Sequence, residues 1–152
     1  MIYLGADHRG FALKEKIKQF LTERKIPFED LGNTVFDSKD DYPIFAEKVA
    51  RKVSESRGQD RGILFCGSGV GVDIVANKFK GVRSALVWDD QEALLTLVRQ
   101  SREKDNANVL SLPADHFTGD QAKEVVRAWL ETPFFGEERH VRRIREISKL
   151  EK

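Results

Sequence analysis

The chain has 152 residues, 40% hydrophobic and 34% charged, which is typical of one globular domain with its own core. Its 26 basic and 25 acidic side chains nearly cancel, so we expect no generic nucleic-acid or anionic-membrane partner. The single cysteine excludes an internal disulfide and a cysteine-rich zinc site. Because the sequence holds no long apolar stretch and no secretory leader, we expect a cytoplasmic protein.

The hydrophobic pattern predicts short strands that alternate with amphipathic helices. The first half of the chain predicts a strand at 2–6, a helix at about 10–24, a strand at 27–31, a polar loop at 32–41, a helix from Pro43 through Val53, a strand at 62–65 and a helix at 70–79. The second half predicts a strand at 83–87, a helix through Leu94 and Val98 that Asp89 or Asp90 could cap, a strand at 108–112, a helix that begins with Thr118 and Asp120 and runs through Leu130, and a helical tail at 136–152.

Strands that alternate with helices in this way predict an α/β fold, in which a five-stranded parallel sheet is covered by helices on both faces. The tail carries a narrow apolar stripe of Val141, Ile144, Ile147 and Leu150. This stripe is too narrow for a buried helix, so we expect the tail to pack across a partner subunit.

The most distinctive stretch is the glycine-rich run Cys-Gly-Ser-Gly-Val-Gly at 66–71, between an apolar strand and a predicted helix. The start of a helix supplies unpaired N–H groups, which bind anions and lower the pKa of a nearby thiol. Cys66 is the only cysteine of the chain and stands at this point, and the Ser68 hydroxyl follows two residues later. These groups predict a proton-transfer site for an oxyanionic intermediate.

Other interpretations of this run have to be weighed. A lone cysteine after a strand is usually a small buried hydrophobe, and a glycine-rich run can be a tight turn. No Gly-Lys-[Ser/Thr] closes the run as in a Walker loop, and its third glycine comes too early for a dinucleotide site. A cysteine-dependent phosphatase would need an arginine where Val72 and Asp73 stand. The glycines around Cys66 favour the proton-transfer interpretation.

Ligands of parallel sheets bind at the carboxyl ends of the strands. We expect three polar groups there: Asp7 and His8 after the first strand, the run at 66–71 after the third, and the segment before the fifth strand.

Five segments together resemble one family. They are Gly-Ala-Asp-His-Arg-Gly-Phe-Ala-Leu-Lys at 5–14, Asp-Tyr-Pro at 41–43, Gly-Ile-Leu-Phe-Cys-Gly-Ser-Gly-Val-Gly at 62–71, Ala-Asn-Lys at 76–78 and Arg-His-Val-Arg-Arg-Ile at 139–144. In order and spacing they resemble ribose-5-phosphate isomerase B and the related galactose-6-phosphate isomerase subunits. The resemblance implies one Rossmann-like domain over 1–152, a three-layer sandwich that forms a homodimer or a dimer of dimers, with active sites at the subunit interface.

The implied reaction is an aldose–ketose interconversion through an enediolate, without metal or organic cofactor. By position, Cys66 matches the base that moves a proton between C1 and C2, and Ser68 matches the hydroxyl that assists at the substrate oxygen. The backbone N–H groups of Gly67, Gly69, Val70 and Gly71 match the anion hole. The sugar-binding positions are Asp7, His8 and Tyr42, and the phosphate-binding positions are His8, Arg139 and Arg143. The two arginines are four residues apart, on one helical face, as suits a phosphate dianion.

Three features depart from the family pattern. Members usually carry a His-Asn pair before the fifth strand, but 101–108 contains no histidine, and Lys104 and Asp105 are the nearest counterparts. The segment 88–106 is a few residues longer than usual. After the fifth strand the family commonly has a phosphate-binding arginine, whereas this chain has Asp115, which would repel a phosphate. We expect all three changes on the portion that the family lends to a neighbouring active site.

Two explanations for the missing histidine stay open. The substrate could be an open-chain sugar phosphate such as a tetrose, which needs no ring-opening acid. Alternatively, the acid role has moved to Asp105, Lys104 or His116, and we place Asp105 in the catalytic set. The leading hypothesis is isomerisation of ribose 5-phosphate to ribulose 5-phosphate. The alternatives are an isomerase of a tetrose or hexose phosphate, and a non-catalytic sugar-phosphate-binding or partner subunit.

Overall fold

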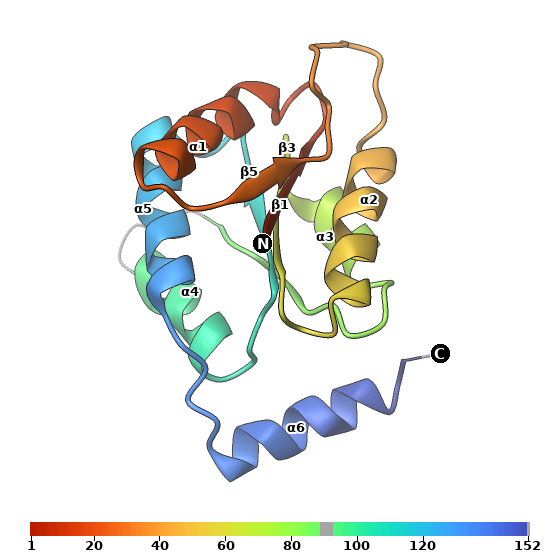
Figure 1. Cartoon of the computed structure of the whole chain (residues 1–152), viewed down its shortest axis with the longest axis vertical. Coiled ribbons are helices and arrows are strands. Elements are labelled where there is room, and N and C mark those ends of the chain that lie inside the picture. Colours follow the sequence, from red (N-terminus) through yellow and green to blue (C-terminus); the bar gives the residue numbers. More distant parts are fainter. Residues whose placement is uncertain (89–92, 152) are drawn as a thin grey trace.

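The computed structural model describes residues 1–88 and 93–151. Within these residues, five parallel strands form one sheet in the order β2-β1-β3-β5-β4, with helices on both faces (Figure 1). The elements are β1 (Ile2–Ala6), α1 (Phe11–Glu23), β2 (Phe28–Asp30), α2 (Tyr42–Glu55), β3 (Arg61–Cys66), α3 (Val70–Ala76), β4 (Ser84–Leu86), α4 (Leu94–Glu103), β5 (Val109–Pro113), α5 (Gly119–Glu131) and α6 (Glu138–Ser148). The predicted three-layer α/β sandwich is confirmed.

The core consists of two apolar layers, one on each face of the sheet. Helices α1, α4 and α5 cover one face, where Trp129 is the largest fully buried side chain. Helices α2 and α3 cover the other face, and Cys66 lies in this second layer. Side chains alternate between the layers along β3, because successive residues of a strand point to opposite faces: Leu64 belongs to the layer of Cys66, and Phe65 to the other.

Helix α5 begins directly after Thr118, as predicted, and Thr118 is its N-cap. Its hydroxyl accepts a hydrogen bond from the Gln121 N–H at 3.2 Å, and the Gln121 side chain accepts one from the Thr118 N–H at 2.8 Å. This reciprocal capping box stabilises a helix by about 1 kcal/mol. The predicted caps of the preceding helix, Asp89 or Asp90, lie outside the described residues.

Helix α3 ends at Ala76, three residues earlier than the predicted end at 79. At this end the side chain of Asn77 pairs with the backbone of Ser84. Its amide oxygen accepts from the Ser84 N–H at 2.9 Å, and its nitrogen donates to the Ser84 carbonyl at 3.2 Å. These bonds tie the end of the helix to the first residue of β4.

Helix α6 lies apart from the two apolar layers, below the amino ends of the strands in Figure 1. Among its residues only His140 is buried, while Ile147 of the predicted stripe is 43% exposed and Leu150, just beyond the helix, is 79% exposed. The expectation that this stripe stays outside the subunit's own core is confirmed. Within the described residues, no helix combines the length and the apolar character needed to cross a lipid bilayer.

Candidate active site

The carboxyl ends of the three central strands bring three loops together. Ala6 of β1 is paired with Phe65 of β3, and Cys66 is paired with Pro113 of β5. Beyond the sheet, the Ala114 N–H donates to the Cys66 carbonyl at 2.8 Å, and the Asp115 N–H donates to the Gly67 carbonyl at 3.1 Å. The loop after β5 therefore continues alongside the glycine-rich loop.

Cys66 is 4% exposed and packs with Leu64 and Val72 beneath the glycine-rich loop. Its Sγ accepts a hydrogen bond from the Gly69 N–H at 3.2 Å. The interpretation of Cys66 as a buried hydrophobe describes its burial correctly. The Gly69 N–H adds a polar contact to the sulfur, which a purely hydrophobic role does not need.

The glycines of this loop make room for neighbouring groups. Gly69 has φ +73°, a left-handed conformation, and a Cβ there would lie 2.6 Å from Leu86 Cδ1. A Cβ on Gly71 would lie 2.5 Å from Cζ of the Tyr42 ring. The structure thus brings Tyr42 against the loop, as its predicted place in the site requires. Ser68 is exposed, and its Oγ accepts from the Val70 N–H at 3.3 Å.

Asp7 and His8 follow β1 and have different surroundings. Asp7 is buried, and its Oδ1 accepts from the Gly10 N–H at 2.9 Å, which closes the turn into α1. Burial raises the pKa of Asp7, although the Gly10 N–H opposes the shift. His8 keeps 30% of its side chain exposed, and its Nδ1 lies 2.7 Å from Asp40 Oδ1. This hydrogen bond raises the pKa of His8.

Asp115 lies against the glycine-rich loop of its own chain, where it forms an ion pair with Arg9. Arg9 Nε donates to Asp115 Oδ2 at 3.1 Å, and both groups cover Gly67. The expectation that position 115 belongs to a portion lent to a neighbouring site is therefore wrong. The loop after β5 runs beside the loop after β3 of the same sheet, because β3 and β5 are adjacent and parallel.

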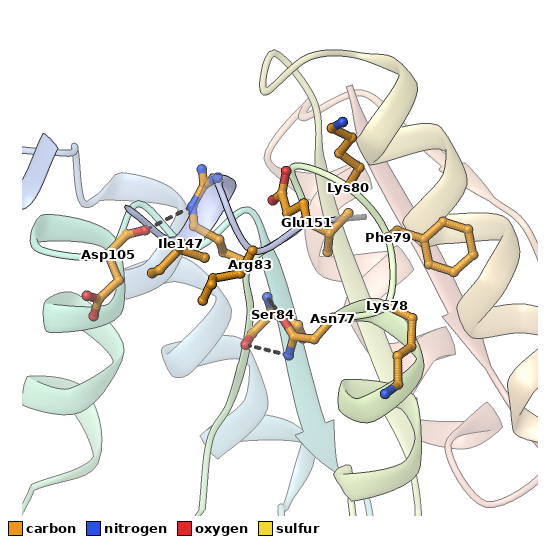
Figure 2. A pocket seen from close by; sticks show the side chains of 11 residues that line it. Asn77, Lys78, Phe79, Lys80, Arg83, Ser84, Asp105, Ile147 and Glu151 are labelled. Atoms are coloured by element: carbon orange, nitrogen blue, oxygen red, sulfur yellow. Dashed lines mark hydrogen bonds between the residues drawn. The ribbon is translucent and has the colours of Figure 1, made fainter. Parts of the chain in front are cut away.

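The segment before β5 lies at the opposite edge of the sheet, so the expectation that it joins the carboxyl ends is wrong. A segment that leads into a parallel strand reaches its amino end. Asp105 lines a cavity of about 640 Å³ at that edge, together with Ile147 and Glu151 (Figure 2). Its backbone carbonyl accepts from Arg83 Nε at 3.0 Å.

Arg139 and Arg143 lie on α6, and Ile147 of the same helix lines the cavity at the amino edge together with Asp105. The Arg139 Nε donates to Glu137 at 2.9 Å. One subunit therefore does not bring Arg139, Arg143 or Asp105 to its own Cys66, whereas it does bring Asp7, His8, Tyr42 and Ser68 to the edge where Cys66 lies.

The sequence did not point to two residues at the carboxyl edge of the sheet, Arg9 and Asp40. Arg9 lies inside the segment at 5–14, but nothing in the sequence pairs it with Asp115, which is 106 positions away. Asp40 directly precedes the Asp-Tyr-Pro segment and contacts His8 across 32 positions. Its place next to a segment of the resemblance was the only available signal.

Comparison with known proteins gives three concordant results. The family model described as Ribose/Galactose Isomerase matches residues 2–147. The chain is 43% identical over 151 residues to a protein of Mycoplasma genitalium named probable ribose-5-phosphate isomerase B, covering 99% of this chain and 95% of that one. It is 38% identical over 150 residues to ribose-5-phosphate isomerase B of Escherichia coli, again covering 99% and 95%.

Solved structures agree in fold. The crystal structure of ribose-5-phosphate isomerase B from Mycoplasma genitalium with bound ribulose-5-phosphate has a TM-score of 0.91 and 41% identity, covering 99% of this chain and 95% of that one. The corresponding enzyme of Thermotoga maritima has a TM-score of 0.87 and 39% identity, covering 97% of both chains.

Proposed function

Since the chain belongs to the ribose/galactose isomerase family, we propose that it interconverts ribose 5-phosphate and ribulose 5-phosphate. The observation that carries the proposal is the buried Cys66 thiol with the Gly69 N–H at 3.2 Å, set at the carboxyl end of β3 in the loop that the Tyr42 ring contacts at Gly71. A relative that shares 41% of its sequence with this chain holds ribulose-5-phosphate in its crystal structure.

The reaction needs a base, a proton donor at oxygen and fixed dipoles. The Cys66 thiolate removes the proton on C2 of the open-chain aldose, and the C–H electron pair forms the C1–C2 double bond while O1 becomes anionic. Backbone N–H groups of the loop stabilise that oxyanion. The proton then returns to C1, the O2 proton leaves, and C2 becomes the carbonyl carbon. Ser68, which is exposed within the loop, carries the proton between the two oxygens.

A second subunit completes the site. Asp7, His8 and Tyr42 of one subunit bind the sugar phosphate, and Arg139 and Arg143 of a second copy hold the phosphate together with His8. Asp105 of that copy opens the sugar ring. Support comes from the exposed stripe of α6, the helix that carries Arg139 and Arg143, and from the cavity at the amino edge that Asp105 and Ile147 line together. The chain therefore works as a homodimer or a dimer of dimers, in the cytoplasm, where phosphorylated sugars are retained.

The test is a substrate panel with the purified chain. Ribose 5-phosphate, a tetrose phosphate, and galactose 6-phosphate are offered separately, and ketose formation is measured. Turnover of ribose 5-phosphate well above that of the other two supports the proposal. Turnover of the tetrose phosphate alone would point to the open-chain alternative, which the absence of histidine at 101–108 favours. Binding without turnover of any sugar would mean a non-catalytic subunit.

A further inference from the structure

We infer that Asp40 is a positioning residue, which fixes the His8 imidazole as a cation for the substrate phosphate and is itself held by a hydrogen-bond network that reaches the buried Lys14. The inference rests on the proposed function, since a phosphorylated sugar is the ligand that His8 would bind. Asp40 lies in the loop between β2 and α2, outside every segment of the family resemblance.

One carboxylate oxygen of Asp40 holds His8 at two points. Asp40 Oδ1 accepts from the His8 backbone N–H at 2.8 Å and lies 2.7 Å from His8 Nδ1. The Asp40 side chain is 6% exposed, whereas that of His8 is 30% exposed. The carboxylate therefore sits behind the imidazole, on the side of the protein, and the imidazole retains access to solvent.

Asp40 stays ionised in this position. Burial raises the pKa of Asp40, but the hydrogen bonds from Asn33 and His8 lower it by more, so that it ends below its ordinary value. An ionised carboxylate only accepts hydrogen bonds, so Nδ1 of His8 must carry a hydrogen. Nε2 is then the nitrogen that meets the ligand, and in the protonated ring it donates to a phosphate oxygen.

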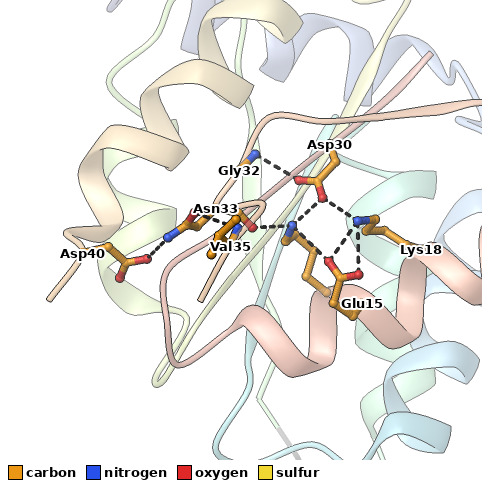
Figure 3. A network of polar contacts seen from close by, with 8 residues as sticks. Glu15, Lys18, Asp30, Gly32, Asn33, Val35 and Asp40 are labelled. Carbon is orange, nitrogen blue, oxygen red and sulfur yellow. Dashed lines mark hydrogen bonds and ion pairs between the residues drawn. The ribbon is translucent and has the colours of Figure 1, made fainter. Parts of the chain in front are cut away.

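A network of partly buried polar groups keeps Asp40 in place (Figure 3). Asn33 Nδ2 donates to Asp40 Oδ2 at 3.0 Å, and the Asn33 carbonyl accepts from Lys14 Nζ at 2.8 Å. Lys14 is fully buried on α1 and pairs with Asp30 of β2 at 2.5 Å. A buried ammonium lowers the stability of the fold unless it is paired. The contacts of Lys14 with Asp30 and with the Asn33 carbonyl therefore favour the loop conformation in which Asn33 lies beside it. The network links the irregular loop to two regular elements.

The charges around His8 favour its cationic form. Asp40 and Asp7 raise the pKa of His8, while Arg9 and the partial burial of the ring lower it, and the net direction is upward. The Phe36 ring meets the imidazole edge-on, with the centroids 6.5 Å apart. Since a raised pKa keeps the imidazolium to higher pH, phosphate binding through His8 extends to a more alkaline range than an isolated histidine allows. Removing the Asp40 charge moves that limit to lower pH.

The test compares Asp40→Asn with Asp37→Asn, a matched change in the same loop at an exposed carboxylate. The His8 ring is titrated by NMR in both variants, and the chain's other two histidines serve as internal references. We expect Asp40→Asn alone to lower the His8 titration midpoint. We also expect it to weaken competition by inorganic phosphate at pH 8 by about tenfold, the size of one charge-assisted hydrogen bond. In turnover of ribose 5-phosphate, KM should rise more than kcat falls, and mainly on the alkaline side.

The NMR and phosphate measurements do not depend on turnover, so they separate this inference from the proposed function. If the chain turns over no ribose 5-phosphate but His8 still titrates lower in Asp40→Asn, the positioning role stands and the substrate assignment falls. An Asn33→Ala variant, which removes the Nδ2 donor to Asp40, should shift His8 in the same direction by less. Equal His8 titrations and equal phosphate inhibition in Asp40→Asn and Asp37→Asn would overturn the inference.

Discussion

Arg9 pairs with Asp115 directly over Gly67. A Cβ on Gly67 would lie 2.5 Å from Arg9 Nε and 2.8 Å from Asp115 Oδ2, so a side chain there would displace this ion pair. The side chains are 57% and 38% exposed, and a pair so exposed contributes about 0–1 kcal/mol to the free energy of unfolding. Its effect is therefore local: Arg9 neutralises a carboxylate that would otherwise face an anionic substrate beside Cys66.

The pairing of Arg9 with Asp115 predicts that KM for ribose 5-phosphate rises in a single variant and partly recovers in a double variant. Arg9→Ala leaves the Asp115 charge uncompensated, so KM for ribose 5-phosphate should rise by about tenfold, equivalent to ~1.4 kcal/mol. Arg9→Ala combined with Asp115→Ala removes both charges and should recover part of that loss. Steady-state kinetics at low ionic strength measures both values. A double variant no better than Arg9→Ala would show that charge compensation is not the role of Arg9.

Replacement of the Cys66 thiol should abolish the chemical step. Cys66→Ala removes the carbon base, and we expect kcat to fall by about a hundredfold or more while substrate binding is largely kept. The thiol is buried, so the variant's melting temperature is measured alongside. Ser68→Ala, at an exposed position, is the comparison with a smaller expected loss. Undiminished turnover of folded Cys66→Ala would remove this residue from the mechanism.

The contact between Gly71 and Tyr42 can be tested without removing the Tyr42 hydroxyl. In Gly71→Ala the new Cβ would lie 2.5 Å from the Tyr42 ring, which must move away from the loop. Gly71 lies in α3, where alanine is the better helix former by about 1 kcal/mol, so the fold should tolerate the change. We expect KM to rise severalfold with little change in melting temperature. Normal KM in this variant would argue that Tyr42 does not bind the sugar.

Shared active sites predict complementation between two inactive variants. Cys66→Ala lacks the base, and Arg139→Ala/Arg143→Ala lacks the phosphate ligands that a second copy supplies. After the two are mixed and their subunits exchanged, half of the dimers are mixed and carry one intact site. Activity should therefore recover to about a quarter of the wild-type value. No recovery after demonstrated subunit exchange would mean that each subunit uses its own residues.

Asp73 should limit stability at neutral pH. Its Oδ1 is covered and has no hydrogen-bond partner among the described residues, and burial raises the pKa of Asp73. A raised pKa in the folded state means that stability is greatest below the pKa of the unfolded chain and is lost as the pH rises through the folded value. Asp73→Asn should therefore gain about 1 kcal/mol at pH 7, or roughly 2–4 °C in Tm, and less near pH 4. Calorimetry of both proteins at the two pH values, with Asp37→Asn as the control, measures the difference; an equal gain at both would contradict it.

The sequence by itself determined the layers of this fold and the location of Cys66. Alternating apolar strands and amphipathic helices leave few arrangements other than a covered parallel sheet, and a glycine-rich turn after a buried strand must lie at its carboxyl end. These are local rules, and they operate within single elements. They also predicted Asp7 and His8 correctly at the neighbouring strand end.

Only the tertiary structure decided which distant residues meet. The order of the strands places β5 beside β3, which brings Asp115 onto the glycine-rich loop and against Arg9 rather than into another site. Asp105 lies at the opposite edge of the sheet, because the segment before a parallel strand leads into the amino end of that strand. The His8–Asp40 pair likewise depends on how an irregular loop folds back over β1. Such contacts join residues far apart in the chain, and no local periodicity encodes them.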